Sequence, residues 1–232
     1  MVNARADTDP AVMRISMDAK ATVKVGDFSR GGKKRVQVKA IDHDFTANAK
    51  VTPVGILLPQ FDEVFLACVT SKVTSDCLVD VLGLWWQSVR ERYSHVSTLV
   101  INLDNGPENQ SHRTQFLKRL VDFAQTYQLS IQLAYYPPYH SKYNPVERCW
   151  GILENHWNGD ILDTIETVVH FARTMTWKGR APVVHLLTTI YHTGVRLTKQ
   201  TMIEVEKHIE RLSGLERWFL KISGAPSLLP DT

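Results

Sequence analysis

The stretch Thr98-Leu-Val-Ile-Asn-Leu-Asp-Asn-Gly-Pro107 decides the fold class. Its first six residues are a short apolar run, which is typical of a buried strand, and the acidic Asp104 follows at once. The next three residues, Asn-Gly-Pro, predict a tight turn. Because α/β sheets usually hold ligands at the carboxyl ends of their strands, we expect a site beside Asp104.

Helices and further strands are predicted on both sides of this stretch. Apolar residues at helical spacing predict helices over 74–92 and 110–128 and a third that begins at Asn144. Early antiparallel strands followed by strand–helix alternation indicate an α/β fold, a mixed sheet flanked by helices. Pro53 predicts that its strand lies at an edge of that sheet. The strands are predicted over 13–19, 35–41, 50–58, 63–70, 98–103 and 130–135.

The chain divides into three regions by composition. Residues 1–10 are polar and are expected to be disordered, and residues 11–158 are expected to form the α/β core. Residues 159–232 are expected to form a helical C-terminal extension, because apolar periodicity there favours helices and Gly159 and Gly179 interrupt it. The predicted helices of this extension cover 161–175, 183–191 and 199–212.

Composition excludes several classes of protein. A chain of 232 residues with 44% hydrophobic and 22% charged residues is neither a disordered chain nor a collagen. Three cysteines without a CxxC motif do not make a disulfide scaffold, and a reducing cytosol is the simplest expectation. No apolar run reaches membrane-spanning length. The net charge of +3 does not by itself predict a nucleic-acid partner.

Three carboxylates are the main candidate functional residues. Asp18 lies on the polar face of the first predicted strand, Asp104 follows a buried strand, and Glu147 lies in the first turn of a predicted helix. If the first strand is central, these groups can converge, and converging carboxylates suit Mg²⁺ or Mn²⁺. Two such ions about 3.5–4 Å apart can clamp the attacking and leaving oxygens of a phosphodiester.

Each carboxylate also has a structural interpretation. Asp18 can be a solvent-facing strand residue, and Asp104 can be a turn former within Asp-Asn-Gly. Glu147 can be the third residue of a capping arrangement in which Asn144 is the N-cap and Pro145 the first helical residue.

The chain resembles the DDE transposases. Asp104-Asn-Gly-Pro-Glu-Asn109 and Tyr135-Tyr-Pro-Pro-Tyr-His-Ser-Lys-Tyr-Asn-Pro-Val-Glu-Arg-Cys-Trp150 resemble the second and third acidic motifs of the insertion-sequence 630/Tc1-mariner lineage. These motifs, taken together with the sequence around them, are similar to the ISAzo13-like bacterial insertion-sequence transposases. Further similar passages are Ile15-Ser-Met-Asp-Ala-Lys20, Phe28-Ser-Arg-Gly-Gly32 and Thr174-Met-Thr-Trp-Lys-Gly179. The resemblance extends from about residue 11 to about residue 222.

The resemblance implies a ribonuclease H-like fold and the catalytic and metal-binding triad Asp18, Asp104 and Glu147, which would hold two Mg²⁺ or Mn²⁺ ions. It implies that the protein cleaves DNA at transposon ends and transfers the cut strand to target DNA. The resemblance also implies that the protein acts as a homo-oligomer on the DNA, in the bacterial cytoplasm, where it is associated with the nucleoid when it acts. The 42 residues between Asp104 and Glu147 exceed the compact Tc1-mariner spacing, because the helix over 110–128 lies between them. Such transposases carry a DNA-reading helix-turn-helix before the catalytic domain, so we expect the chain to be truncated at its N-terminus.

Basic residues near the motifs are candidate DNA contacts. Phosphates attract clustered lysine and arginine side chains, although a solvated hairpin tip and ordinary surface charge are the alternatives. His140 and Ser141 could orient water or phosphate, and Asp42-His43-Asp44 is a rival acidic cluster. The tryptophans at 85, 86, 150 and 157 have helical core spacing, which favours packing over base stacking. The candidate DNA-binding residues are Arg30, Lys33, Lys34, Arg35, Lys142 and Arg148.

Two other functions stay open. One keeps the fold and predicts a ribonuclease H-like nuclease, which would cut RNA–DNA hybrids without strand transfer. The other predicts a catalytically silent DNA-binding or oligomerisation remnant of a decayed element.

Overall fold

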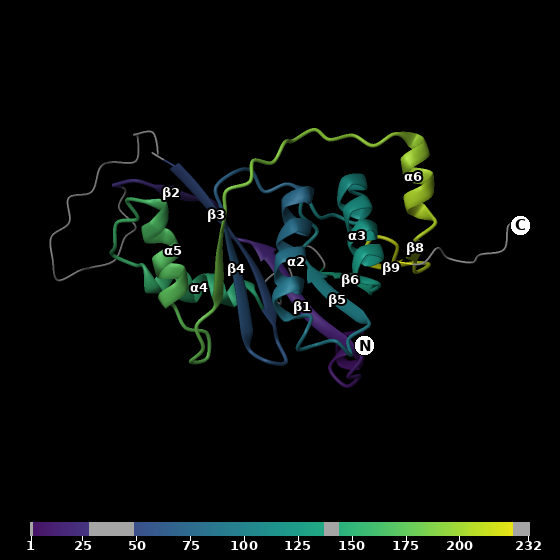
Figure 1. The fold of residues 1–232 in the computed structure, drawn as a ribbon, viewed down its shortest axis with the longest axis horizontal. Helices are drawn as coiled ribbons and strands as arrows, with labels where there is room; N and C mark the ends of the chain where they lie inside the picture. The colour runs from purple at the N-terminus through teal and green to yellow at the C-terminus, as the bar shows by residue number, and fades with distance from the viewer. Residues whose placement is uncertain (1, 28–48, 137–143, 225–232) are drawn as a thin grey trace, which may run out of the picture.

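The computed structural model describes residues 2–27, 49–136 and 144–224. Its strands form one mixed sheet in the order β7-β4-β3-β1-β5-β6-β9-β8, with β2 paired to β3 (Figure 1). The strands are β1 Val12–Ala19, β2 Val23–Val25, β3 Ala49–Leu58, β4 Glu63–Val69, β5 Thr98–Leu103, β6 Ser130–Tyr135, β7 Val183–Leu187, β8 Ile209–Arg211 and β9 Phe219–Ser223. The helices are α1 Val2–Ala6, α2 Ser75–Val89, α3 Thr114–Tyr127, α4 Glu147–His156, α5 Ile165–Thr174 and α6 Lys199–Glu206.

The first strand lies in the middle of the sheet, which is the condition under which the three carboxylates can converge. β1 pairs antiparallel with β3 on one side and parallel with β5 on the other, β3 pairs antiparallel with β4, and β5 pairs parallel with β6. Three consecutive antiparallel strands that continue into parallel crossovers confirm the predicted ribonuclease H-like mixed sheet flanked by helices.

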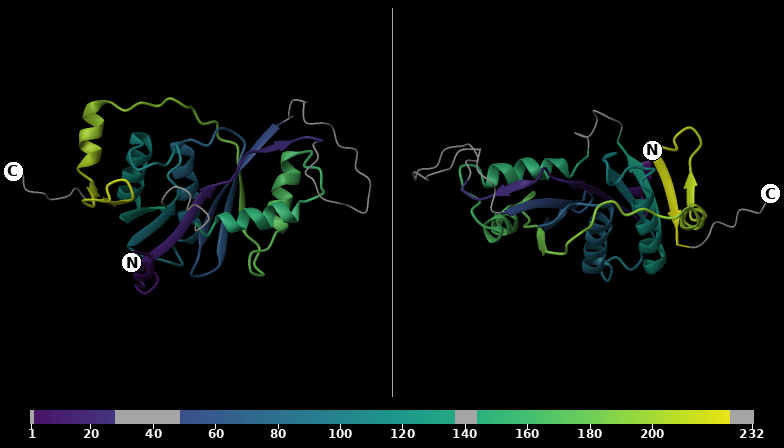
Figure 2. Two further views of the ribbon diagram at one scale, coloured as in Figure 1. Left: turned by 180° about the vertical axis from the view of Figure 1, so that it is seen from behind. Right: turned by 90° about the horizontal axis from the view of Figure 1, so that it is seen from above.

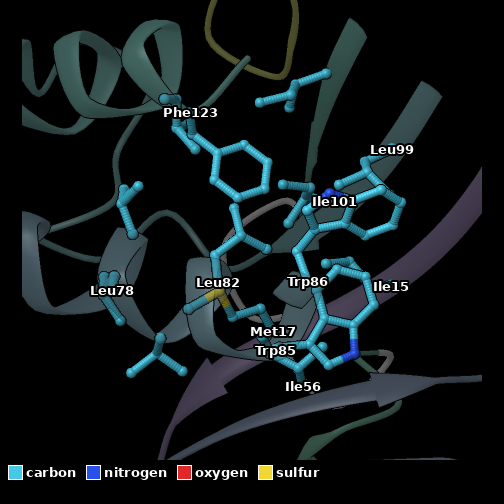
Figure 3. Close-up of a cluster of buried hydrophobic side chains, with 14 of the residues drawn as sticks. Ile15, Met17, Ile56, Leu78, Leu82, Trp85, Trp86, Leu99, Ile101 and Phe123 are labelled. Atoms are coloured by element: carbon cyan, nitrogen blue, oxygen red, sulfur yellow. The ribbon is translucent and has the colours of Figure 1, made fainter. Parts of the chain in front are cut away.

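Helices cover both faces of the sheet. α2 and α3 pack on one face, where Met17, Trp85 and Ile101 belong to one buried cluster (Figure 3). α4 and α5 pack on the other face near β3 and β4, around Trp157 and Val168 (Figures 1 and 2). All four tryptophans predicted to be core residues are buried. Because successive strand residues face opposite sides, the polar residues of β1 lie on the α4 side.

The prediction that Pro53 marks an edge strand is wrong. β3 lies between β4 and β1, and Pro53 pairs with Cys68. The Lys20 amide donates to the Pro53 carbonyl, so the side of Pro53 that lacks an N–H faces the chain between β1 and β2. The missing donor therefore falls where β3 changes partner from β1 to β2, and no ladder hydrogen bond is lost there.

The C-terminal region differs in part from the prediction. α5 and α6 form within the predicted helices 161–175 and 199–212, but the predicted helix over 183–191 is wrong, because residues 183–187 form β7 beside β4. Short apolar runs fit a strand as well as a helix, and the β-branched Val183-Val184 favours the strand. β8 and β9 also join the sheet, beyond β6 (Figure 1).

The N-terminus contains a short helix where disorder was expected. α1 buries Ala6, and Asn3 accepts a hydrogen bond of 3.0 Å from Asn102 of β5. Arg14 of β1 forms an ion pair with Asp7 after the helix, at 2.8 Å. These contacts fasten the segment to the sheet.

Two further sequence expectations concern the membrane and the cysteines. Among the described residues, no helix has both the length and the apolar character that a membrane crossing requires. Cys68, Cys77 and Cys149 are buried free thiols, as expected for small hydrophobic core residues.

Candidate active site

Asp18 lies on β1, and Asp104 directly follows the neighbouring strand β5. The parallel register pairs Ser16 of β1 with Asn102 of β5, and two further residues along each strand bring Asp18 beside Asp104. Both side chains lie on the sheet face opposite Met17 and Leu103, which belong to the α2–α3 cluster. The central position of β1 therefore places two carboxylates at one end of the sheet.

The environment of Asp18 excludes the solvent-facing interpretation. The side chain is half-buried, and its Oδ2 accepts a hydrogen bond of 2.7 Å from Nε1 of Trp150. The pKa of Asp18 is raised to about 6: burial raises it most, the nearby charges of Asp104 and Glu147 also raise it, and hydrogen bonds from Trp150 and the Ala19 backbone lower it. Asp104 and Glu147 therefore both act electrostatically on Asp18.

Glu147 is the first residue of α4, and the capping interpretation is wrong. Val146 is the N-cap residue and makes no side-chain cap bond. The Asn144 side chain points instead to β1, where its Oδ1 accepts from the Ser16 hydroxyl and its Nδ2 donates to the Met17 carbonyl at 3.3 Å. The Val146 amide donates to the Ser16 oxygen at 3.0 Å. This fully buried lock fixes the start of α4, and with it Glu147, against the strand of Asp18.

Asn144→Ala is expected to destabilise the fold by about 1–2 kcal/mol, because it removes the acceptor of the buried Ser16 hydroxyl hydrogen and the amide donor to the Met17 carbonyl. The measurement is urea denaturation followed by circular dichroism. Asn155→Ala, at an exposed position of the same helix, is the matched control and is expected to change stability by less than about 0.5 kcal/mol. Equal midpoints for the two variants would contradict the lock.

The loop after Asp104 is held from several sides. Asn109 donates to Asp104 Oδ1 at 2.9 Å, and the buried Tyr135 hydroxyl donates to the Asn109 carbonyl at 2.6 Å. A Cβ atom at Gly106 would lie 3.2 Å from Asp104 Oδ2, so glycine lets the loop close tightly over the carboxylate. Ser75 of α2 donates to the Glu108 carbonyl at 2.7 Å. Asp104 therefore helps to close the turn, as expected for a turn former within Asp-Asn-Gly. Its carboxylate also lies near enough to Asp18 to raise the pKa of that residue.

The donor set fits a hard divalent cation. Aspartate and glutamate oxygens are the ligands that Mg²⁺ and Mn²⁺ prefer. Burial and the negative charges of Asp104 and Glu147 disfavour the charged form of Asp18, so a neighbouring cation would stabilise the Asp18 carboxylate. Asn109 Oδ1, buried near Gly106 and Asp104, has no hydrogen-bond partner among the residues that the structure describes. In the described part of the chain, no three His, Cys, Asp or Glu side chains are already grouped closely enough to hold one ion.

Most of the predicted DNA contacts lie outside the described residues. These are Arg30, Lys33, Lys34, Arg35 and Lys142, together with His140, Ser141 and the rival cluster Asp42-His43-Asp44. Arg148 is described and is exposed on the first turn of α4, next to Glu147.

A groove of about 520 Å³ lies next to the loop after Asp104. Lys50 and Lys72 line it together with hydroxyl side chains such as Thr70 and Ser71, and Glu108 joins them from the loop. Glu108 forms an ion pair with Arg113 at 3.3 Å, which offsets the one acidic charge of the groove lining.

Three contributors to the site were missed from the sequence. Asn144 was interpreted as a helix cap, Trp150 as a core residue, and Ser16 was given no role. Asn144 and Trp150 stand within the third acidic motif, but their partners on β1 are 127 to 132 residues away, so spacing along the chain gives no signal of the contact.

One family of known proteins matches nearly the whole chain. The family model described as the Rhodopirellula transposase DDE domain matches residues 2–224. A search of curated proteins found no match. Among solved structures, the Mos1 transposase paired-end complex with left transposon end matches with a TM-score of 0.49 and 11% identity over 67% of this chain, which spans less than half (45%) of that protein. The match over nearly the whole length places the chain in the family of the Rhodopirellula transposase DDE domain.

Proposed function

We propose that this chain is a polynucleotidyl transferase that cleaves DNA at transposon ends and transfers the cut strand to target DNA. The observation that carries the proposal is the placement of Asp18 on β1, Asp104 directly after the neighbouring β5 and Glu147 at the start of α4, where Asp104 and Glu147 both raise the pKa of Asp18. Membership in a DDE transposase family supports the same chemistry.

The residues have distinct roles in this proposal. Asp18 on β1 and Asp104 directly after β5 would share the divalent ions, and Glu147 would complete the second position. When bound, such ions offset the negative charge that develops on the phosphate. The Asn109 amide and the Asn144 lock hold two of these carboxylates in place before substrate arrives.

The reaction has two displacements at phosphorus. In the first, water attacks the phosphate at the transposon end and loses a proton to solvent, the bond from phosphorus to the 3′-oxygen breaks, and that oxygen takes up a proton from solvent and leaves as a 3′-hydroxyl. In the second, this 3′-hydroxyl attacks a target phosphodiester, and the displaced target strand leaves with its own 3′-hydroxyl. No covalent protein–DNA intermediate is needed, so no nucleophilic side chain is required.

The DNA partner is proposed to lie along the basic side chains around the site. Arg148 stands next to Glu147, and Lys50 and Lys72 line the groove beside the loop after Asp104. Lysine and hydroxyl groups contact DNA phosphates without reading sequence. We further propose that the chain acts as a homo-oligomer on paired ends in the bacterial cytoplasm.

The test compares three substrates in Mn²⁺: a duplex that carries the end of the chain's own element, the same duplex with target plasmid, and an RNA–DNA hybrid. We expect nicking of the duplex, joining of its 3′-end to the plasmid, and neither reaction in EDTA. Cleavage of the hybrid alone would favour the ribonuclease H-like nuclease. A chain that binds the duplex but cuts neither substrate would be the silent remnant.

A further inference from the structure

We propose that Trp150 is a positioning residue of this site, whose indole N–H fixes the orientation of the Asp18 carboxylate for a divalent cation. The inference rests on the proposed function and adds a residue to it. Trp150 Nε1 lies 2.7 Å from Asp18 Oδ2, which is a short charge-assisted hydrogen bond. Because the indole is a neutral donor, it holds the carboxylate without neutralising the negative charge that a cation needs.

The ring of Trp150 occupies the space above a glycine that lies next to Asp18. Gly55 of β3 is the strand partner of Asp18, and a Cβ atom there would lie 2.5 Å from Cη2 and 3.0 Å from Cζ2 of the Trp150 ring. The same atom would lie 3.1 Å from Cγ2 of Val146. The ring therefore lies directly against the strand backbone, in space that any side chain at position 55 would take.

The helix that carries Trp150 is fixed to the same strand at a second point. The Ser16–Asn144 lock holds the start of α4, and Trp150 holds Asp18 two residues further along β1. Glu147 and Trp150 are three residues apart, so they lie on one face of α4. Trp150 thus fixes the distance between Asp18 and Glu147 as well as the orientation of the carboxylate.

A second tryptophan, the C-cap residue of α4, provides a matched control. The fully buried Trp157 also donates its indole N–H to a carboxylate, Glu154 Oε2 at 2.6 Å, but that carboxylate lies only three residues away on α4 and outside the triad. Replacement of either tryptophan by phenylalanine removes an indole donor and a similar volume. A loss specific to Trp150 therefore reports on Asp18 and not on general packing.

The first measurement is Mn²⁺ affinity by electron paramagnetic resonance, with Mn²⁺ alone as the probe. We expect Trp150→Phe to weaken binding by about 10-fold or more, as is typical when a side chain that orients a metal ligand is lost. Trp157→Phe is expected to stay within about 2-fold of the wild type. Unchanged affinity in Trp150→Phe, or an equal loss in both variants, would overturn the inference.

The second measurement needs no variant to fold. In ¹⁵N spectra of the wild-type chain, the assigned indole N–H resonance of Trp150 is expected to shift when Mg²⁺ is added, and that of Trp157 is not. A stationary Trp150 resonance during saturating Mg²⁺ binding would overturn the inference. If the wild-type chain neither binds Mn²⁺ nor cuts DNA, the proposed function fails; if it does both and Trp150→Phe behaves identically, the failure concerns Trp150 alone.

Discussion

Asp104→Asn is expected to lower the rate of Mn²⁺-dependent DNA nicking by about 10³-fold or more. The substitution removes one carboxylate charge from the position where two divalent ions would be shared, and ions in such sites supply several kcal/mol of transition-state stabilisation. The variant should fold normally, because an asparagine Oδ1 can still accept the hydrogen bond of 2.9 Å from Asn109. Initial rates on the duplex described above measure the effect.

The control for this substitution is Asp163→Asn, at an exposed position before α5. It makes the same chemical change away from the triad and is expected to leave the nicking rate unchanged. Asp104→Asn with at least a tenth of the wild-type rate, and an unaltered melting temperature, would remove Asp104 from the catalytic set.

Asp18→Asn is expected to stabilise the fold by about 2–3 kcal/mol at pH 7.5. The native pKa of Asp18 is raised to about 6 from 3.8, so the native state holds this proton more tightly than the unfolded chain. The free energy of unfolding contributed by Asp18 is therefore highest below about pH 4 and is lost as the pH rises through about 6. Asparagine stays neutral, and at 1.36 kcal/mol per pKa unit the shift corresponds to about 3 kcal/mol at most.

The measurement is urea denaturation of wild type and Asp18→Asn at pH 7.5 and at pH 4, in EDTA. The variant should exceed the wild type at pH 7.5, and the difference should shrink at pH 4, where the wild-type carboxyl is largely protonated. A variant that is less stable than the wild type at pH 7.5 would show that the Asp18 charge is favourable in the apo fold. The predicted gain in stability would be accompanied by loss of DNA cleavage, as is common when charge is concentrated for function.

The central part of the fold could be predicted because its patterns are local. The apolar run 98–103 and the periodicity of the flanking helices identify β5, α2 and α3 from a few neighbouring residues. Asp104 could be assigned because it follows that run directly. The edge assignment from Pro53 failed because it depended on which strands pair with β3, and pairing between distant segments leaves no local signal.

The support of the site could not be predicted for the same reason. The Asn144 lock and the contact of Trp150 with Asp18 join α4 to β1 across more than 120 residues. A buried asparagine that precedes a helix resembles an N-cap in sequence, and a buried tryptophan at helical spacing resembles a core residue. Only the packing of α4 on β1 distinguishes these roles.

The most direct test of the proposed metal site is the location of Mn²⁺ by anomalous diffraction in crystals of the chain with a short DNA duplex. We expect anomalous peaks within about 2.0–2.2 Å of carboxylate oxygens of both Asp18 and Asp104, with Glu147 as the third carboxylate of the site. Mn²⁺ bound elsewhere, with these two aspartates free of metal in the presence of DNA, would contradict it.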